Sequence, residues 1–173
     1  MKESIIILMG VSGCGKSVIG QALAERLGIP FLEGDAFHPP ENLAKMGSGM
    51  PLEDADRIDW MVAIRAAMMQ ERQSAIVACS ALKRKHREFL SDISKKVQFI
   101  HLRGDHDLLK RRIESRTGHF FDPKLLDSQL TSLEEPSPEE GAIVIEVDRT
   151  VENIVATIHA RLETSEQSKR KSS

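Results

Sequence analysis

Residues 10–17 read GVSGCGKS and match the pattern G-x-x-x-x-G-K-[S/T], which is typical of a loop that binds phosphate groups. The apolar run Ile5–Leu8 leads into this stretch, and a helical pattern leaves it from Ser17 to Leu27. This strand–loop–helix context is the one that the pattern requires. Glycine lacks a side chain, so its repeated use lets the backbone turn tightly and leaves the N–H groups uncovered. Together with the positive end of the following helix, those N–H groups are expected to form a cradle for an anion.

The side chains that end this stretch indicate a nucleoside triphosphate as the ligand. Lys16 should reach the β and γ phosphates, and the Ser17 hydroxyl should bind Mg²⁺. No Asn/Thr-Lys-x-Asp signature for guanine is present, which favours ATP. Cys79-Ser80 stands where a phosphate-loop hydrolase usually carries an aspartate, which argues against a motor or signalling GTPase. The expected nucleotide site consists of Gly10, Ser12, Gly13, Cys14, Gly15, Lys16 and Ser17.

The composition bounds what the rest of the chain can be. Its 173 residues are 40% hydrophobic and 29% charged, which suggests a single domain over residues 1–162. The polar segment 163–173 is expected to be a disordered tail. The net charge of −2 gives no electrostatic case for nucleic acid or an anionic membrane as a partner, and no apolar run approaches membrane-spanning length. Two cysteines without metal-ligand spacing fit a reduced, cytoplasmic setting, and the apolar run 5–9 is too short for a signal peptide.

Short apolar runs alternate with helical patterns along the chain. Strands are expected at residues 5–9, 29–33, 74–79, 97–102 and 142–147. Helices are expected at residues 16–27, from 39 onward, 54–72, 82–93, 105–116, 123–133 and 151–162, with a glycine-rich, mobile loop at 45–51. This alternation predicts an α/β fold in which a five-stranded parallel sheet has helices on both faces and a small lid at about residues 117–138.

Polar side chains follow the ends of the second and third expected strands. Ligands of parallel sheets bind beyond the carboxyl ends of the strands, so these side chains should share one cleft with the phosphate loop. Asp35 could accept the proton of an attacking hydroxyl group or hold Mg²⁺ through water, although a loop aspartate can also simply cap a turn. Ser80, Lys83 and Arg84 follow the third strand and should reach the floor of the cleft.

Other charged residues near these positions allow two interpretations each. His38 could hydrogen-bond a polyol substrate, act as a base, or only pack in its loop. Arg57 could bind an anionic group of the substrate as a fork, or pair with acids in its own helix. Lys85–Arg87 are expected to form a solvated helix face. Arg111, Arg112 and Arg116 could neutralise phosphoryl charge from a closing lid, or form a basic helix surface.

Several blocks of the sequence resemble the gluconokinase family. The most specific are residues 34–39 (GDAFHP) and 79–83 (CSALK), because a phosphate loop alone is shared with shikimate and nucleotide kinases. The resemblance covers roughly residues 5–160. It continues through Asn42, residues 45–46, 49–52 and 54–57, Trp60, and residues 99–102, 116–120, 125–129 and 133–136.

The resemblance implies a P-loop kinase fold and transfer of the γ-phosphoryl group of ATP, with Mg²⁺, to the 6-hydroxyl group of D-gluconate. It implies a homodimer as well. Asp35 would orient and deprotonate that hydroxyl and share the metal with Ser17, while Arg57 with Lys83 or Arg84 would pair with the gluconate carboxylate. Lys16 would assist the transfer, and Arg112 and Arg116 would close over the phosphates. The implied substrate site consists of Asp35, His38, Arg57, Ser80, Lys83, Arg84, His119 and Gln129.

Two other functions stay open at this point. The chain could phosphorylate another small hydroxy acid, such as shikimate. It could also be a regulatory protein that binds ATP without turning over a small substrate. Asp35 and the lid arginines favour a kinase, because a sensor needs neither a base nor a closing lid.

Overall fold

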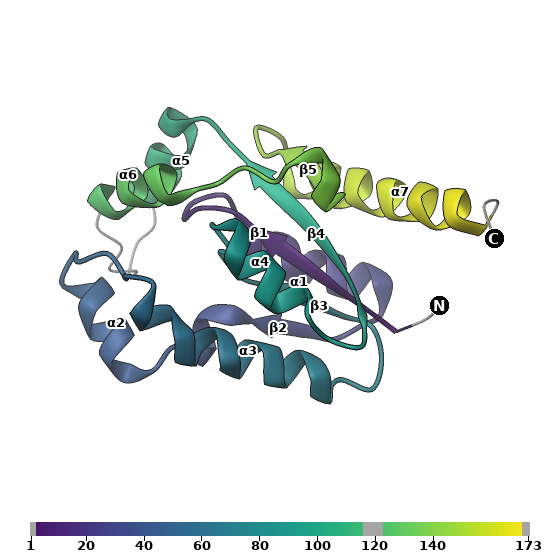
Figure 1. Cartoon of the computed structure of the whole chain (residues 1–173). Helices are drawn as coiled ribbons and strands as arrows, with labels where there is room; N and C mark the ends of the chain where they lie inside the picture. Colours follow the sequence, from purple (N-terminus) through teal and green to yellow (C-terminus); the bar gives the residue numbers. More distant parts are fainter. Residues whose placement is uncertain (1–2, 116–122, 171–173) are drawn as a thin grey trace.

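The computed structural model describes residues 3–115 and 123–170. Its centre is a five-stranded sheet in the order β2-β3-β1-β4-β5, and every neighbouring pair of strands is parallel. The α/β architecture expected from the alternating pattern is thereby confirmed (Figure 1). The strands are β1 Ser4–Met9, β2 Phe31–Glu33, β3 Ala75–Ala78, β4 Lys96–Arg103 and β5 Ile143–Glu146.

Helices pack on both faces of this sheet. The α-helices are α1 Lys16–Leu27, α2 Pro40–Gly47, α3 Ile58–Gln70, α4 Arg84–Ser91, α5 His106–Glu114, α6 Pro123–Ser132 and α7 Val151–Arg170. Short 3-10 turns lie at η1 Gly34–Phe37, η2 Ala55–Arg57 and η3 Pro138–Glu140. Within the described ranges, no helix combines the length and apolar character needed to span a bilayer.

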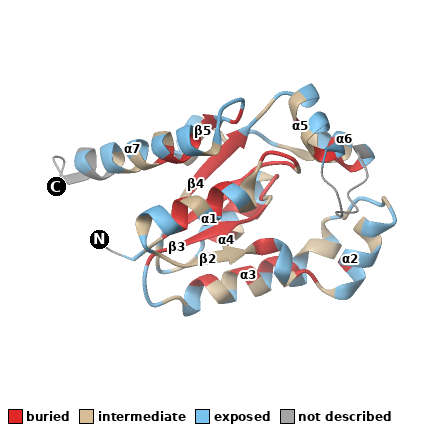
Figure 2. Ribbon diagram, turned by 180° about the vertical axis from the view of Figure 1, so that it is seen from behind, coloured by how far each residue is buried: buried red, intermediate tan, exposed pale blue. Residues whose placement is uncertain are grey.

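The period of two along β1 divides the core into two layers. Ile6 and Leu8 point into the cluster that contains residues of α1, α5 and α7. Ile5, Ile7 and Met9 point into the other cluster, with residues of α3 and α4. Because both faces are covered, β3 is apolar throughout and β1 is apolar from Ile5 onward, and Figure 2 shows these strands as a continuously buried part of the chain.

Three elements differ from the sequence-based expectation. The helix expected from residue 54 begins instead with the 3-10 turn η2, and α3 starts at Ile58. The α2 helix extends to Gly47 and so includes part of the stretch expected to be a loop. The α7 helix runs on to Arg170, although residues from 163 onward were expected to be disordered. Residues 163–170 contain neither glycine nor proline, so no residue of that segment breaks the helix.

Glycine at position 34 allows β2 and β3 to approach each other closely at the edge where the loops begin. A Cβ atom added to Gly34 would lie 2.0 Å from the carbonyl oxygen of Ala78, at the end of β3. No side chain fits in that gap unless the two backbones separate. The first residue of η1 is therefore pressed against the last residue of β3.

We expect Gly34→Ala to lower the free energy of unfolding by about 3 kcal/mol, because overpacking a tight backbone contact is destabilising. Gly47→Ala is the matched control, since a Cβ at that helical position would meet nothing within 4 Å. Denaturant unfolding monitored by circular dichroism measures both variants. Equal midpoints for the two variants would contradict the assigned contact between Gly34 and β3.

Candidate active site

A cavity of about 400 Å³ opens at the carboxyl edge of the sheet. Its walls come from the loop after β1, the segment from η1 to η2, the end of β3 and the helix α6. The structure thus brings together residues that are far apart in the sequence but were expected to share one cleft. They are Ser12, Lys16, Asp35, His38, Arg57, Ser80 and Gln129.

Three glycines of the phosphate loop have positive φ angles, which residues with a side chain rarely adopt. Gly10, Gly13 and Gly15 have φ angles of 143°, 84° and 94°. The α1 helix begins directly after this loop, so its first-turn N–H groups have no acceptor inside the helix and can face an anion. Lys16 Nζ donates to the carbonyl oxygens of Gly10, at 3.0 Å, and Val11, at 3.2 Å.

The helix α6 contacts this loop directly. The Ser12 N–H donates to Gln129 Oε1 at 2.7 Å, so a side chain from the expected lid region already meets the phosphate loop. Leu125, Ser128 and Ser132 of α6 complete that wall of the cavity. Arg116 and His119, which were expected in the site, lie outside the described residues.

Asp35 stands at the first turn of η1, immediately after β2. Its side chain is 72% exposed and lines the cavity together with Lys16. The turn that carries it is anchored from α3, because Trp60 Nε1 donates to the Gly34 carbonyl oxygen at 2.7 Å. The carboxylate therefore projects into the cleft from a backbone that is fixed by packing.

His38 is buried beside Asp35, with only 8% of its surface exposed. Its ring stacks on Trp60 with 4.3 Å between the centroids and 9° between the planes. Burial lowers the pKa of His38 to about 4, against the opposing effect of Asp35, whose Oδ1 lies 3.9 Å from Nε2. The imidazole is consequently neutral at physiological pH.

Arg57 is a cation of the cavity wall that is available for an anionic ligand, in addition to Lys16. Among the described residues, no carboxylate lies within ion-pairing distance of its guanidinium group. The group lies 6.0 Å from the ring centroid of Trp60, and burial lowers the pKa of Arg57. An unpaired, partly buried guanidinium is well suited to bind a carboxylate by two parallel hydrogen bonds.

Lys83 lies in a second hollow of about 290 Å³ that shares Arg57 with the first. Its Nζ is 2.9 Å from both carboxylate oxygens of Asp54, and Lys85 Nζ is 2.6 Å from one of them. The hydrogen bonds from Lys85 and Lys83 hold the pKa of Asp54 well below its usual range. Lys83 therefore already has a carboxylate partner, which it shares with Lys85, whereas Arg57 has none within ion-pairing distance among the described residues.

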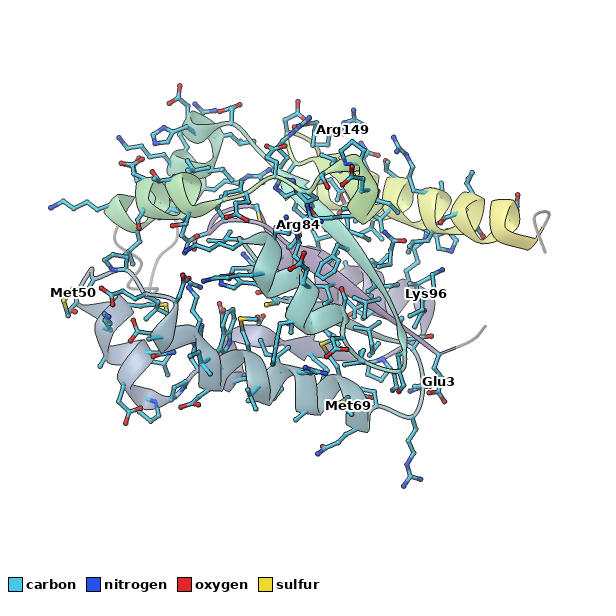
Figure 3. The ribbon with its side chains drawn as sticks, in the orientation of Figure 1. Glu3, Met50, Met69, Arg84, Lys96 and Arg149 are labelled. Atoms are coloured by element: carbon cyan, nitrogen blue, oxygen red, sulfur yellow. The ribbon has the colours of Figure 1, made fainter. Side chains whose placement is uncertain are left out.

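Two other candidate arginines lie outside the linings of these hollows. Arg84 projects from α4, pairs with Glu88 at 2.9 Å and is labelled in Figure 3. Arg112 Nη2 donates to the Val147 carbonyl oxygen at 2.5 Å.

The expectation of a solvated face at residues 85–87 is wrong for its last two members. His86 is buried, and Arg87 is 2% exposed. Arg87 donates to the carbonyl oxygens of Ala81 and Leu82, both at 3.2 Å, and forms a two-pronged pair with Glu140 at 2.5 and 3.0 Å. The partner lies 53 residues further along the chain, so nothing local in the sequence indicates this burial.

The oxygen atoms that the structure offers as ligands are compatible with Mg²⁺. Mg²⁺ usually keeps several waters and takes only one or two protein oxygens together with substrate phosphates. The half-buried Ser17, in the first turn of α1 beside the glycine cradle, offers one such oxygen. Within residues 3–115 and 123–170, no cluster of three or more acidic, histidine or cysteine side chains forms a metal cage.

The sequence is similar to those of known small-molecule kinases. A family model described as shikimate kinase matches residues 12–163. The probable gluconokinase of Xenopus tropicalis is 41% identical over 177 residues, with 92% of this chain and 93% of that protein covered. The thermoresistant gluconokinase of Escherichia coli (strain K12) is 40% identical over 157 residues, covering 88% and 90%.

Solved structures agree with these sequence matches. A gluconokinase from Sinorhizobium meliloti 1021 superposes with a TM-score of 0.90 at 41% identity, covering 98% of this chain and 97% of that one. A shikimate kinase from Aquifex aeolicus superposes with a TM-score of 0.57 at 16% identity, which shows a shared fold alone.

Proposed function

The chain belongs to the gluconokinase family of phosphate-loop kinases, and we propose that it transfers the γ-phosphoryl group of ATP to the 6-hydroxyl group of D-gluconate. One observation carries the proposal. A single cavity presents a phosphate-loop lysine, a carboxylate and an unpaired guanidinium, which are the groups needed for a phosphate, a hydroxyl and a carboxylate.

The proposed reaction is an in-line displacement. Asp35 accepts the proton of the 6-hydroxyl group as its oxygen forms a bond to the γ phosphorus, and the bond from that phosphorus to the bridging oxygen of ADP breaks. Lys16 exchanges its contacts with the Gly10 and Val11 carbonyl oxygens for the phosphates. Positioning and charge neutralisation supply most of the acceleration, because little covalent work is asked of the protein.

Magnesium, when bound, would neutralise charge on the phosphates. Ser17 is the residue proposed to hold it directly, and Asp35 would reach it through water. Arg112, in α5, and Arg116, just before the lid expected at about residues 117–138, are proposed to close over the phosphates. Arg112 would first have to leave the Val147 carbonyl oxygen.

The gluconate carboxylate is proposed to bind Arg57. Lys83 is a weaker candidate because it already pairs with Asp54, and Arg84 is weaker still because it lies outside the lining and pairs with Glu88. His38, Ser80 and Gln129 are proposed to contact the polyol hydroxyls from the remaining walls, with His119 joining them from the lid.

Gluconate-dependent release of ADP from ATP is the experiment that tests the function. A kinase for shikimate is the rival to be included, because the fold is shared with shikimate kinases. Turnover with gluconate and not with shikimate supports the proposal. Turnover with shikimate alone, or ATP binding without turnover of any acid, would overturn it.

Asp35→Asn should lower kcat by about 10²- to 10⁴-fold, because the amide cannot accept the proton of the hydroxyl group. The affinity for ATP, measured by calorimetry, should stay nearly unchanged. Asp59→Asn serves as the control, since Asp59 is exposed on α3. A parallel loss of ATP binding in the Asp35 variant would indicate a structural role for Asp35 instead.

Arg57→Gln should raise KM for gluconate by about 10- to 100-fold, the range expected when a charge-assisted hydrogen-bond pair is lost. D-Glucitol, which has the same hydroxyl chain without the carboxylate, separates this effect from general damage. Its weak phosphorylation should be almost unaffected by the substitution. If the substitution impairs phosphorylation of gluconate and of D-glucitol equally, Arg57 does not recognise the carboxylate.

We also propose a cytoplasmic homodimer. Both cysteines of the chain are buried and free, which suits a reducing compartment.

Ile58, Val62 and Met69 are exposed along one side of α3, where a second copy could cover them (Met69 is labelled in Figure 3). Light scattering should give twice the mass of one chain, and Val62→Asp should shift the protein towards monomer. A wild-type mass of a single chain would contradict the dimer.

A further inference from the structure

Two buried polar side chains, Asn42 and His38, contact each other next to Asp35. Asn42, in α2, is 4% exposed, and His38 is 8% exposed. The nitrogen Nδ2 of Asn42 lies 2.7 Å from the Asp56 carbonyl oxygen and 3.2 Å from Nδ1 of His38. The far side of the same imidazole, Nε2, faces Asp35 Oδ1 at 3.9 Å.

The Asp56 carbonyl determines the direction of every hydrogen bond in this chain of contacts. A backbone carbonyl oxygen can only accept, so the Asn42 atom that faces it must be the amide nitrogen. That nitrogen carries two hydrogens, one for the carbonyl oxygen and one directed at His38 Nδ1. An atom that receives a hydrogen bond must present a lone pair. Nδ1 is therefore unprotonated, and the single ring hydrogen lies on Nε2.

The ring has little freedom to turn away from this arrangement. It is stacked on Trp60, which is itself fixed by its hydrogen bond to the Gly34 carbonyl oxygen. The low pKa of His38 agrees with a neutral ring, and the charged groups that act on it are Asp35 and Arg57. The Nε2–H group consequently points out of the packed layer towards the carboxylate in the cavity.

We propose that Asn42 is a positioning residue that holds His38 as the Nε2–H tautomer, so that His38 donates a hydrogen bond to Asp35 or the reacting hydroxyl and is not a base. This assignment rests on the proposed function and deepens it. Of the two side chains Asp35 and His38, it leaves only Asp35 able to accept the proton of the hydroxyl group. A fixed donor beside that carboxylate orients the oxygen lone pair that receives the proton. It also decides between the roles of donor and base that the sequence left open for His38.

The tautomer can be measured without any substrate. Nitrogen-15 NMR of histidine-labelled protein distinguishes protonated from unprotonated ring nitrogens, and His38→Gln assigns the signal among the six histidines. We expect Nδ1 to appear as an acceptor and Nε2 to carry the hydrogen. A hydrogen on Nδ1 in the wild-type protein would overturn the proposal, whatever the enzyme's substrate is.

Asn42→Asp, measured above the pKa of the new carboxyl group, should move the hydrogen, because an ionised carboxylate can only accept and Nδ1 must then donate to it. Lys45→Gln is the control. Lys45 also joins α2 to the η2 segment, through Asp56 Oδ2 at 2.6 Å, but it does not touch His38. The control should keep the wild-type tautomer. If Nδ1 stays unprotonated in Asn42→Asp while the new carboxyl group is ionised, Asn42 does not set the tautomer.

Two substitutions of His38 test the role while leaving Asn42 in place. His38→Gln can put an N–H group near the position of Nε2, whereas His38→Asn reaches only as far as Nδ1. Both lose the stack on Trp60 and neither can act as a base, so their difference isolates the donor. We expect kcat with gluconate to be about 10- to 100-fold higher for the Gln variant than for the Asn variant.

Equal and severe losses in the Gln and Asn variants would overturn the donor role. Unfolding midpoints of the two variants, measured in parallel, separate a loss of packing from a loss of the donor. If the wild-type protein fails to phosphorylate gluconate, the proposed function fails, and the NMR result still decides the tautomer.

Discussion

The carboxyl end of β3 is the point on which the rest of the site depends. Backbone contacts reach it from both neighbouring strands. The Gly10 N–H donates to the Ser80 carbonyl oxygen at 3.2 Å, and Gly34 presses against the Ala78 carbonyl oxygen from the other side. The phosphate loop and the loop that carries Asp35 are therefore registered against the same short segment of backbone. Their separation is set by strand spacing, which side-chain motion cannot change.

This segment adopts an unfavourable conformation that its surroundings maintain. Ala81 has a φ angle of 41°, in the left-handed region that residues with a Cβ seldom occupy. The buried guanidinium of Arg87 binds the carbonyl oxygens of Ala81 and Leu82 and is neutralised by Glu140. Removing either partner would leave a buried charge uncompensated, at a typical cost of about 3–5 kcal/mol, so the pair fixes the guanidinium against these two carbonyl oxygens. The result is that Ser80 faces the cavity, while Lys83 begins the turn into α4.

The sequence predicted the parts of the site that depend on local signals. The apolar run before the phosphate loop, the glycines within it and the strand-end position of Asp35 all have short-range patterns, and the structure places Lys16 and Asp35 on one cavity. The long-range contacts that hold the site in place could not be predicted from local patterns in the sequence. Arg87 meets Glu140 from 53 residues away, and Trp60 meets Gly34 from 26 residues away. A run of Lys, His and Arg is typical of a solvated surface, and only tertiary packing shows that His86 and Arg87 are interior.

In the proposed nucleotide complex, phosphate binding would exchange hydrogen bonds that the phosphate loop already makes. An N–H group has one strong acceptor, so a phosphate oxygen that takes the Ser12 amide displaces Gln129 Oε1. Because Gln129 belongs to α6, that exchange also loosens the contact between this helix and the loop. The carbonyl oxygens of Gly10 and Val11 likewise compete with phosphate for Lys16. The net affinity for the triphosphate would then be a difference between new charge-assisted hydrogen bonds and existing ones, including the one from the Ser12 N–H to Gln129 of α6.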